Sequence, residues 1–190
     1  NGAYCYNVNE KKWTNYLHDE NNPRSLPYDK VLSIFEDSHR QIWLTTQGGG
    51  FCKFHPETET FTSYDSRNGL PNDVVYQIVE DKEGLMWLTT NNGLVSFQPA
   101  TGAMKVYTTA NGLLGEQFNY RSSFETEDGT IYLGSIDGFV AFNPKNFSEN
   151  KSLPSIVITD FLLFGKEVYP GDPSSPLKKS INFLDELVLQ

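Results

Sequence analysis

The sequence predicts an all-β protein: a partial, open β-propeller of about three to four four-stranded blades, followed by the first strands of a β-sandwich. Two observations predict this fold. Aromatic, glycine and proline positions recur with a period near 44 residues, which is the length of one propeller blade. The chain also contains 15 glycines and 10 prolines but few helical patterns, which favours short strands joined by tight turns.

The repeat is clearest around one aromatic position. Trp43, Trp87 and Tyr132 occupy the same place in "QIWLTT", "LMWLTT" and "TIYLGS", at intervals of 44 and 45 residues. An acidic turn precedes each of them, and a polar turn with glycine and then a strand ending in Phe-x-Pro follow. Because several residue types keep register through three copies, chance similarity does not account for the pattern.

The middle copy shows how one blade is built. We expect its four strands, from the innermost outward, at 74–80, 85–90, 93–98 and 103–108. The turns "DKEGL", "NNGL" and "PATG" between them contain glycine, which takes a positive φ without a Cβ clash. Gly93, and Gly138 at the matching place in the last copy, are therefore structural residues of the repeat.

Both ends of the repeat array are incomplete. "GAYCYNV" and "KWTNY" correspond to the third and fourth strands of a blade, and residues 118–143 supply three strands of the last one. Since a closed ring needs about four to eight blades, we expect a fragment of a larger ring whose end blades expose faces that neighbours normally cover. We predict that the isolated piece forms a homodimer through those ends.

The pattern changes after the last Phe-Asn-Pro. We assign 1–144 to the C-terminal blades of the propeller, 145–154 to a polar linker and 155–190 to the start of a truncated Ig-like sandwich domain. In this last part "SIVITDFLLFGKEV" alternates as one or two strands and "ELVLQ" starts another. So few strands cannot form a core alone, and we expect them to lean on other parts of the protein.

The tryptophans have two interpretations. Neighbouring blades cover both faces of a blade, so large flat side chains fill the wedge between them, and burying ~200 Å² of aromatic surface is worth up to about 5 kcal/mol. A platform on which a sugar ring stacks is the alternative. The structural role is the better interpretation for Trp43 and Trp87.

The composition restricts the partners. A net charge of −9 and a pI near 4.8 argue against nucleic-acid binding, which needs clustered Lys and Arg. No apolar run approaches the ~20 residues of a membrane span. The chain opens on Asn1 without a signal peptide, so we expect a processed or excised piece. The three histidines are scattered in polar, turn-like contexts, and we predict no metal site and no cofactor.

The positions of the two cysteines do not favour a disulfide bond between them. Cys5 and Cys52 fall on equivalent third strands of consecutive blades. Alternation along the strands directs their thiols to opposite faces, so we expect no disulfide.

The copies "SIFEDSHRQIWLTTQGGGFCKFHPET" and "QIVEDKEGLMWLTTNNGLVSFQPATG" resemble the two-component-regulator propeller repeat. "GEQFNYRSSFETEDGTIYLGSIDGFVAFNP" resembles the last blade before a sandwich, and "PSIVITDFLLFGKEVYPGD" resembles the start of the Tyr-rich sandwich domain that follows such propellers. The resemblance covers nearly the whole chain. It is to the hybrid two-component sensors of gut-type Bacteroidetes.

This resemblance implies a function that the residues alone do not show. It implies a periplasmic sensor region followed by a membrane helix, a histidine kinase, a receiver and a DNA-binding module. Members of the family typically detect oligosaccharides released from glycans and switch on genes for their breakdown. The kinase and receiver parts are absent from this chain, so we expect no catalytic residue and no kinase activity in it.

Candidate ligand-binding residues lie where propeller ligands usually bind, at the loops that enter the innermost strands and at the channel mouth. They are Asn72, Asp73, Asn91, Asn92, Asn119 and Arg121. Asn and Asp bind sugar hydroxyls well, but they also suit turns for local reasons. Arg121 falls where Leu32 and Tyr76 lie in other copies, so it either pairs with an acid of a neighbouring blade or contacts a ligand or another domain.

Three functions therefore remain open. The first is a sensor module that relays oligosaccharide binding to a kinase by shifting the packing of domains, with the remaining blades and the sandwich as partners. The second is a propeller lyase, which needs a general base and often a metal at the channel. The third is a passive interaction scaffold.

Overall fold

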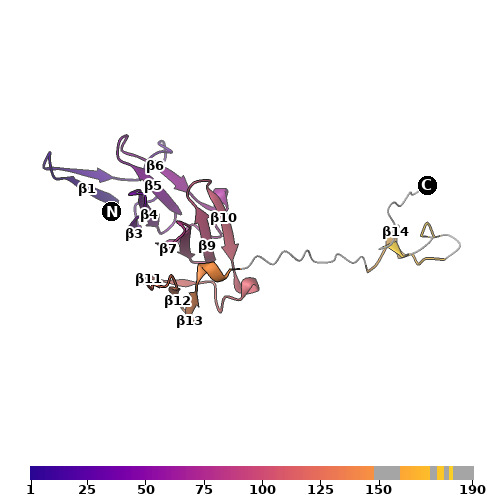
Figure 1. Cartoon of the computed structure of the whole chain (residues 1–190). Coiled ribbons are helices and arrows are strands. Elements are labelled where there is room, and N and C mark those ends of the chain that lie inside the picture. Colours follow the sequence, from indigo (N-terminus) through magenta and orange to yellow (C-terminus); the bar gives the residue numbers. More distant parts are fainter. Residues whose placement is uncertain (148–158, 172–174, 178–179, 182–190) are drawn as a thin grey trace. The chain divides into compact units, whose positions relative to one another are not determined.

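The computed structural model describes residues 1–147, 159–171, 175–177 and 180–181. Two compact units form along the chain, Asn1–Phe147 and Ser148–Gln190 (Figure 1). The first unit is built from antiparallel sheets with the strand order of propeller blades. The predicted all-β partial propeller is therefore confirmed.

Two sheets of the first unit are complete four-stranded blades, in which each strand pairs with its neighbour in sequence. The first contains β3 (Val31–Glu36), β4 (Ile42–Thr46), β5 (Phe51–His55) and β6 (Thr60–Tyr64). The second contains β7 (Val75–Glu80), β8 (Met86–Thr90), β9 (Gly93–Gln98) and β10 (Ala103–Tyr107). All four strands that the sequence predicts for the middle blade are confirmed to within a residue or so.

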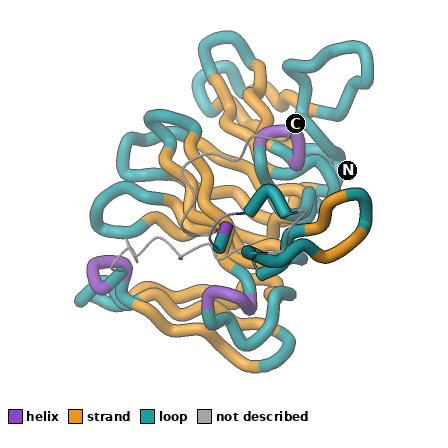
Figure 2. The backbone as a smooth tube through the Cα atoms, turned by 90° about the vertical axis from the view of Figure 1, so that its right-hand side faces the viewer, coloured by secondary structure: helices purple, strands orange, loops and turns teal. Residues whose placement is uncertain are grey.

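The two end blades are partial, as expected. β1 (Ala3–Asn7) pairs with β2 (Lys12–Tyr16), and β11 (Phe118–Glu125), β12 (Ile131–Ser135) and β13 (Gly138–Phe142) form a three-stranded sheet. The innermost strands β3, β7 and β11 lie next to one another (Figure 1). The strands gather into separate sheets, with the loops at their ends (Figure 2).

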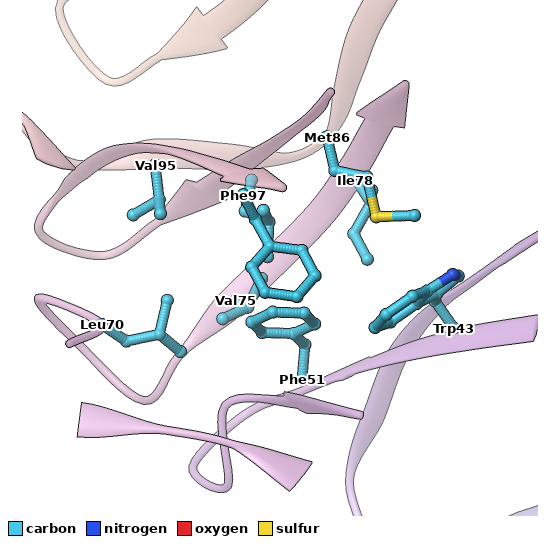
Figure 3. Packing of buried hydrophobic residues seen from close by; sticks show 9 residues of the cluster. Trp43, Phe51, Leu70, Val75, Ile78, Met86, Val95 and Phe97 are labelled. Atoms are coloured by element: carbon cyan, nitrogen blue, oxygen red, sulfur yellow. The ribbon is translucent and has the colours of Figure 1, made fainter. Parts of the chain in front are cut away.

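Aromatic and aliphatic side chains fill the space between blades. Trp43 and Phe51 of one blade pack with Ile78, Met86 and Phe97 of the next in a single buried cluster (Figure 3). The ring centroids of Phe51 and Phe97 lie 5.0 Å apart in a T-shaped arrangement. The tryptophan is therefore an inter-blade filler, as the repeat predicts.

Trp87 has the same role at the following junction. It is buried with Leu94 against Phe118, Ile131 and Leu133 of the last sheet. Tyr132, the third member of the series, is 38% exposed, because no described residues cover the outward face of the last sheet. The last sheet thus exposes the residue that is buried at the matching place in the complete blades.

The acidic turn before each tryptophan holds the indole in place. Trp43 Nε1 donates to Asp37 Oδ2 at 2.9 Å, and Asp37 Oδ1 accepts the backbone N–H groups of His39 and Gln41. Asp81 repeats this arrangement around Trp87. One carboxylate thus satisfies both the turn and the buried indole.

The third copy has lost both halves of this arrangement. Tyr132 replaces the indole, and Thr126 replaces the acid and bonds through its hydroxyl to the backbone of Thr130. The backbone bond across the turn, from Thr126 N to Thr130 O at 2.9 Å, is the same as in the other two copies. The turn therefore persists without the acid, because the Thr126 hydroxyl and the backbone bond hold it.

The second unit is described only in part. β14 (Leu162–Leu163) pairs with β15 (Lys166–Glu167) in a hairpin that falls in the predicted "SIVITDFLLFGKEV" strand region. The strand expected at "ELVLQ" lies outside the described residues. Of the predicted linker, Lys145 and Asn146 lie in the short 3-10 turn η3 (Pro144–Asn146), and residues 148–154 lie outside the description.

Candidate functional site

A carboxylate at the start of each innermost strand ties down the loop that leads into it. Asp73 accepts from the backbone N–H of Ser66 at 2.7 Å and from its hydroxyl at 3.1 Å. The matching acids make the same backbone bond in the other copies, Asp29 with His18 N at 2.7 Å and Glu116 with Thr109 N at 3.1 Å. Asp73, a predicted ligand residue, therefore has a structural role of its own.

The backbone of the same acids links consecutive blades. Gly50 N donates to Asp73 O at 2.8 Å and Gly93 N to Glu116 O at 2.6 Å. A Cβ on Gly93 would lie 2.7 Å from the carbonyl oxygen of Tyr107, and the φ of Gly93 is 106°. The structural role predicted for Gly93 therefore follows from a close approach of backbones as well as from the turn.

Gly138 differs from its counterpart. Its φ is 137°, but a Cβ there would meet no atom within 4 Å, since no fourth strand pairs with β13 among the described residues. The conformational reason for glycine thus remains, and the close approach is not made within the described residues.

The loops at this end of the blades enclose a polar cleft of about 410 Å³. It lies between the segment 18–27 and the loop that carries Arg67 and Asp73, with Gly48 and Gly49 along its lining. Its side chains include His18, Asp19 and Asn22. Amide, carboxylate and guanidinium groups of this kind are suited to hydrogen bonding a hydroxylated ligand.

Of the predicted ligand residues, only Asp73 lines this cleft. The spacing of the repeat contains a signal for the other residues of the cleft. Leu26 follows Tyr16 by ten positions, whereas Leu70 follows Tyr64 by six at the matching place. The four extra residues lengthen the segment that forms one wall of the cleft. The spacing of the strands alone does not predict this wall.

The charge pair of the cleft is formed by Asp65 and Arg67. Arg67 Nε donates to both carboxylate oxygens of Asp65 at 3.0 Å. These hydrogen bonds lower the pKa of Asp65 below its ordinary value. The Asp65 carboxylate is mostly covered, while the Arg67 side chain is exposed and open to a ligand.

The predicted asparagines of the middle blade have mostly local partners. Asn72 Oδ1 accepts from Val74 N at 2.8 Å, and Asn92 Nδ2 donates to Pro71 O at 3.4 Å. Asn91 is different, because its Oδ1 accepts from Tyr76 Oη of the innermost strand at 2.8 Å. Asn91 therefore lies at the end of the blade near the innermost strand, where its amide nitrogen has no partner among the described residues.

Asn119 and Arg121 lie in an insertion of the last innermost strand. Glu116 and Glu125 are nine residues apart, whereas the matching acids Asp73 and Glu80 are seven apart. The two extra residues interrupt the pairing of β11 with β12 between Phe118 and Ser123. The alignment that placed Arg121 on Tyr76 did not include this insertion.

Arg121 is exposed and has a φ of 51°, in the left-handed region. In the part of the chain that the structure describes, no carboxylate lies within 4 Å of its guanidinium. The ion pair with an acid of a neighbouring blade, one of the two roles considered for it, is therefore not formed within the described residues. Asn119 Nδ2 donates to Ser135 O at 2.8 Å.

The cysteines are both free, as predicted. Cys5 is exposed and Cys52 is buried. Burial raises the pKa of the Cys52 thiol to about 12. Among the described residues, no group of three or more His, Cys, Asp or Glu side chains is placed to hold a metal ion, and no helix is long and apolar enough to cross a membrane.

Comparison with known proteins agrees with the repeat. The family described as two component regulator propeller matches residues 69–92. A curated relative, Histidine kinase P4 of Formosa agariphila, is 34% identical over 154 residues, which are 80% of this chain and 11% of that protein. The chain thus spans about a ninth of the length of this relative.

Solved structures share the fold. The extracellular domain of a protein described as the hybrid two component system BT4673 from B. thetaiotaomicron is 25% identical, with a TM-score of 0.61 over 75% of this chain and 20% of that one. Virginiamycin B lyase from Staphylococcus aureus is 16% identical, with a TM-score of 0.53 over 74% of this chain and 47% of that one. The second likeness is one of fold alone.

Proposed function

Because this chain is built from two-component regulator propeller repeats, we propose that it is part of the extracytoplasmic ligand-sensing region of a hybrid two-component sensor. In the parent protein, ligand binding shifts domain packing, and a histidine kinase then changes the transcription of genes. The observation that carries this proposal is the likeness, at 25% identity, to the extracellular domain of a protein described as a hybrid two component system. A periplasmic location belongs to the same proposal.

The ligand that fits the proposal is an oligosaccharide derived from a glycan. The cleft beside Arg67 and Asp73 offers hydrogen-bonding groups of both kinds, donors and acceptors, which the hydroxyl groups of a sugar need. The Tyr28 ring beside Gly48, 43% exposed, supplies an apolar surface at its edge. A sugar ring has an apolar face that stacks on such a ring.

Calorimetric titration of the 190-residue chain with a panel of oligosaccharides tests the proposal. We expect binding without turnover of the sugar. Asn22→Ala and Arg67→Met should each weaken binding by about tenfold or more, since each removes a hydrogen-bonding group worth about 1.4 kcal/mol or more.

Glu57→Gln is the matched control. Glu57 lies in the turn after β5, at the opposite end of that strand from Gly50 and the cleft, and it is exposed. Affinity should not change in this variant. Unchanged affinity in Asn22→Ala and Arg67→Met would exclude the cleft, and a processed sugar in the product analysis would favour the lyase.

We also propose that the chain associates through its end faces. Phe124, Tyr132 and Phe139 line an apolar hollow of about 270 Å³ on the outward face of the last sheet. An apolar face of this kind favours burial, by further blades in the parent protein or by a second copy when the piece is isolated. Light scattering across a concentration series should show a dimer, and a monomer at the highest concentration would contradict this.

Two alternatives have less support. The likeness to virginiamycin B lyase is one of fold alone, so it carries no argument for catalysis. A passive scaffold remains the alternative if no saccharide in the panel binds. A pull-down with the other domains of the parent protein would then be the relevant measurement.

A further inference from the structure

A hydrogen bond that joins the first two complete blades is missing at the next junction, where β11 carries the two-residue insertion. Thr45 Oγ1 donates to Tyr76 O of the next blade at 3.3 Å and also bonds to Ser33 Oγ at 2.8 Å. Thr89 lies at the matching place in β8, but its hydroxyl is buried without a partner among the described residues. The carbonyl that would accept from it falls in the inserted segment of β11.

A second polar group at this place is also left without a partner. Gln77 lies directly across from Thr89 in the pairing of β7 with β8, and its amide nitrogen is buried and unpaired within the described chain. Both side chains are more than nine-tenths buried. Since an unpaired buried polar group is destabilising, these two groups lower the stability of this junction.

Two side chains of the segment whose pairing is interrupted are exposed to solvent. Tyr120 is 52% exposed and lies with its ring 4.6 Å from that of Tyr76. Arg121, in its left-handed conformation, is exposed. Extra residues that bend a strand often redirect side chains toward a ligand.

The insertion carries one exposed cation, Arg121, while the amide nitrogen of Asn119 already donates to Ser135 O. The Arg121 guanidinium has no carboxylate within 4 Å in the described part of the chain, although the protein carries 24 acidic residues. The oxygen of Asn91 accepts from Tyr76, and its amide nitrogen has no partner among the described residues. An exposed guanidinium that no carboxylate of the described residues neutralises is suited to an anionic ligand group.

We propose that the inserted segment 119–122 binds the anionic group of the ligand, a carboxylate or a sulfate carried by a sugar. The inference rests on the proposed sensing function and specifies its ligand class. The polar cleft around Asp19 and Asp73 contains several carboxylates and does not favour an anion. The cleft and the insertion therefore differ in the ligand groups that they accept.

Matched ligands separate this inference from the general function. Titrations would use an oligogalacturonate, the same oligosaccharide as its methyl ester, a sulfated neutral oligosaccharide, and inorganic sulfate alone. We expect one of the two acidic sugars to bind at least about tenfold more tightly than its uncharged form. The methyl ester distinguishes carboxylate recognition from recognition of the sugar, and inorganic sulfate distinguishes a bare ion site.

Variants of Arg121 test the residue itself. Arg121→Gln should remove the preference for the acidic sugar, and Arg121→Lys should retain part of it because the charge remains. Leu114→Gln, at an exposed position outside the insertion, is the control and should bind as the wild type does. Equal affinity of wild type and Arg121→Gln for the acidic sugar would overturn the inference.

Deleting Tyr120 and Arg121 supplies an independent readout. The deletion restores the seven-residue spacing of the other copies, so Thr89 should gain a carbonyl partner and the melting temperature should rise. Acidic-sugar binding should be lost at the same time. A lower melting temperature would show that the insertion stabilises the fold, and would overturn the inference. If only neutral sugars bind, and neither the Arg121 substitution nor the deletion alters their affinity, the sensor function stands and binding of an anionic group by the insertion is excluded.

Discussion

Asp81 Oδ2 accepts a hydrogen bond of 2.9 Å from the indole nitrogen of Trp87, and both side chains are buried. The other oxygen of the same carboxylate accepts two backbone N–H groups of the turn. A single acid therefore joins the hairpin turn to the packing between blades.

Asp81→Ala should lower the free energy of unfolding by about 2–4 kcal/mol, because it leaves an indole and two turn amides without their charged partner. Urea unfolding followed by tryptophan fluorescence measures the change. Asp128→Ala, in the exposed turn of the third copy where no indole needs a partner, should be clearly less destabilising than Asp81→Ala. Equal losses would show that the indole bond contributes little.

Thr45→Val and Thr89→Val should have opposite effects although they alter the same position of the repeat. Thr45 loses bonds to Ser33 and Tyr76, at a cost of about 1–2 kcal/mol. Thr89→Val removes an unpaired buried hydroxyl and should be neutral or stabilising. Chemical denaturation of the two variants side by side checks this, and a loss in Thr89→Val equal to that in Thr45→Val would contradict it.

Gly93→Ala should be more destabilising than Gly102→Ala. Both glycines have positive φ, so each substitution carries a conformational cost of about 1 kcal/mol. Only at Gly93 does the new Cβ meet a backbone atom, Tyr107 O at 2.7 Å, whereas nothing lies within 4 Å at Gly102. Thermal melts of the two variants measure the difference, and equal losses would mean that the backbones move apart easily.

Asp65→Asn should reduce stability at neutral pH and matter less in acid. The pKa of Asp65 is lowered in the folded state by its bonds to Arg67, so its contribution is present above its ordinary value near 4 and is lost as the pH falls through the lowered value. The Arg67 side chain is exposed, so we expect less than about 1 kcal/mol. Urea midpoints from pH 7 to pH 2 should converge for wild type and variant; a constant difference would exclude the carboxylate as the cause.

The two thiols should react at different rates. Cys52 is buried with its pKa raised to about 12, so it should resist iodoacetamide at pH 8 until the chain unfolds. Cys5 is exposed and should react in the folded protein. Mass spectrometry after labelling with and without urea tests this. Rapid labelling of Cys52 in buffer would show that the junction near β5 opens.

The repeat made the blades predictable because their chemistry is local. The Trp position, the turn glycines and the Phe-x-Pro strand ends each act within one hairpin, so their spacing indicates strand order directly. The candidate site was less predictable. Asp73 lies at the cleft as predicted from its loop, but the sequence pattern does not indicate His18, Asn22 or Arg67, because their place at the cleft depends on an insertion that brings segments of two copies together.

The sequence by itself determined the strand order, the period and the role of Trp43 and Trp87, because these depend on contacts that every copy repeats. Only the tertiary structure decided what the departures from the repeat do. It showed that, within the described residues, Arg121 lies in an insertion without an acidic partner and Thr89 does not make the bond that Thr45 makes. The physical reason is that hydrogen bonds between blades depend on where neighbouring backbones lie, which the spacing within one copy does not specify.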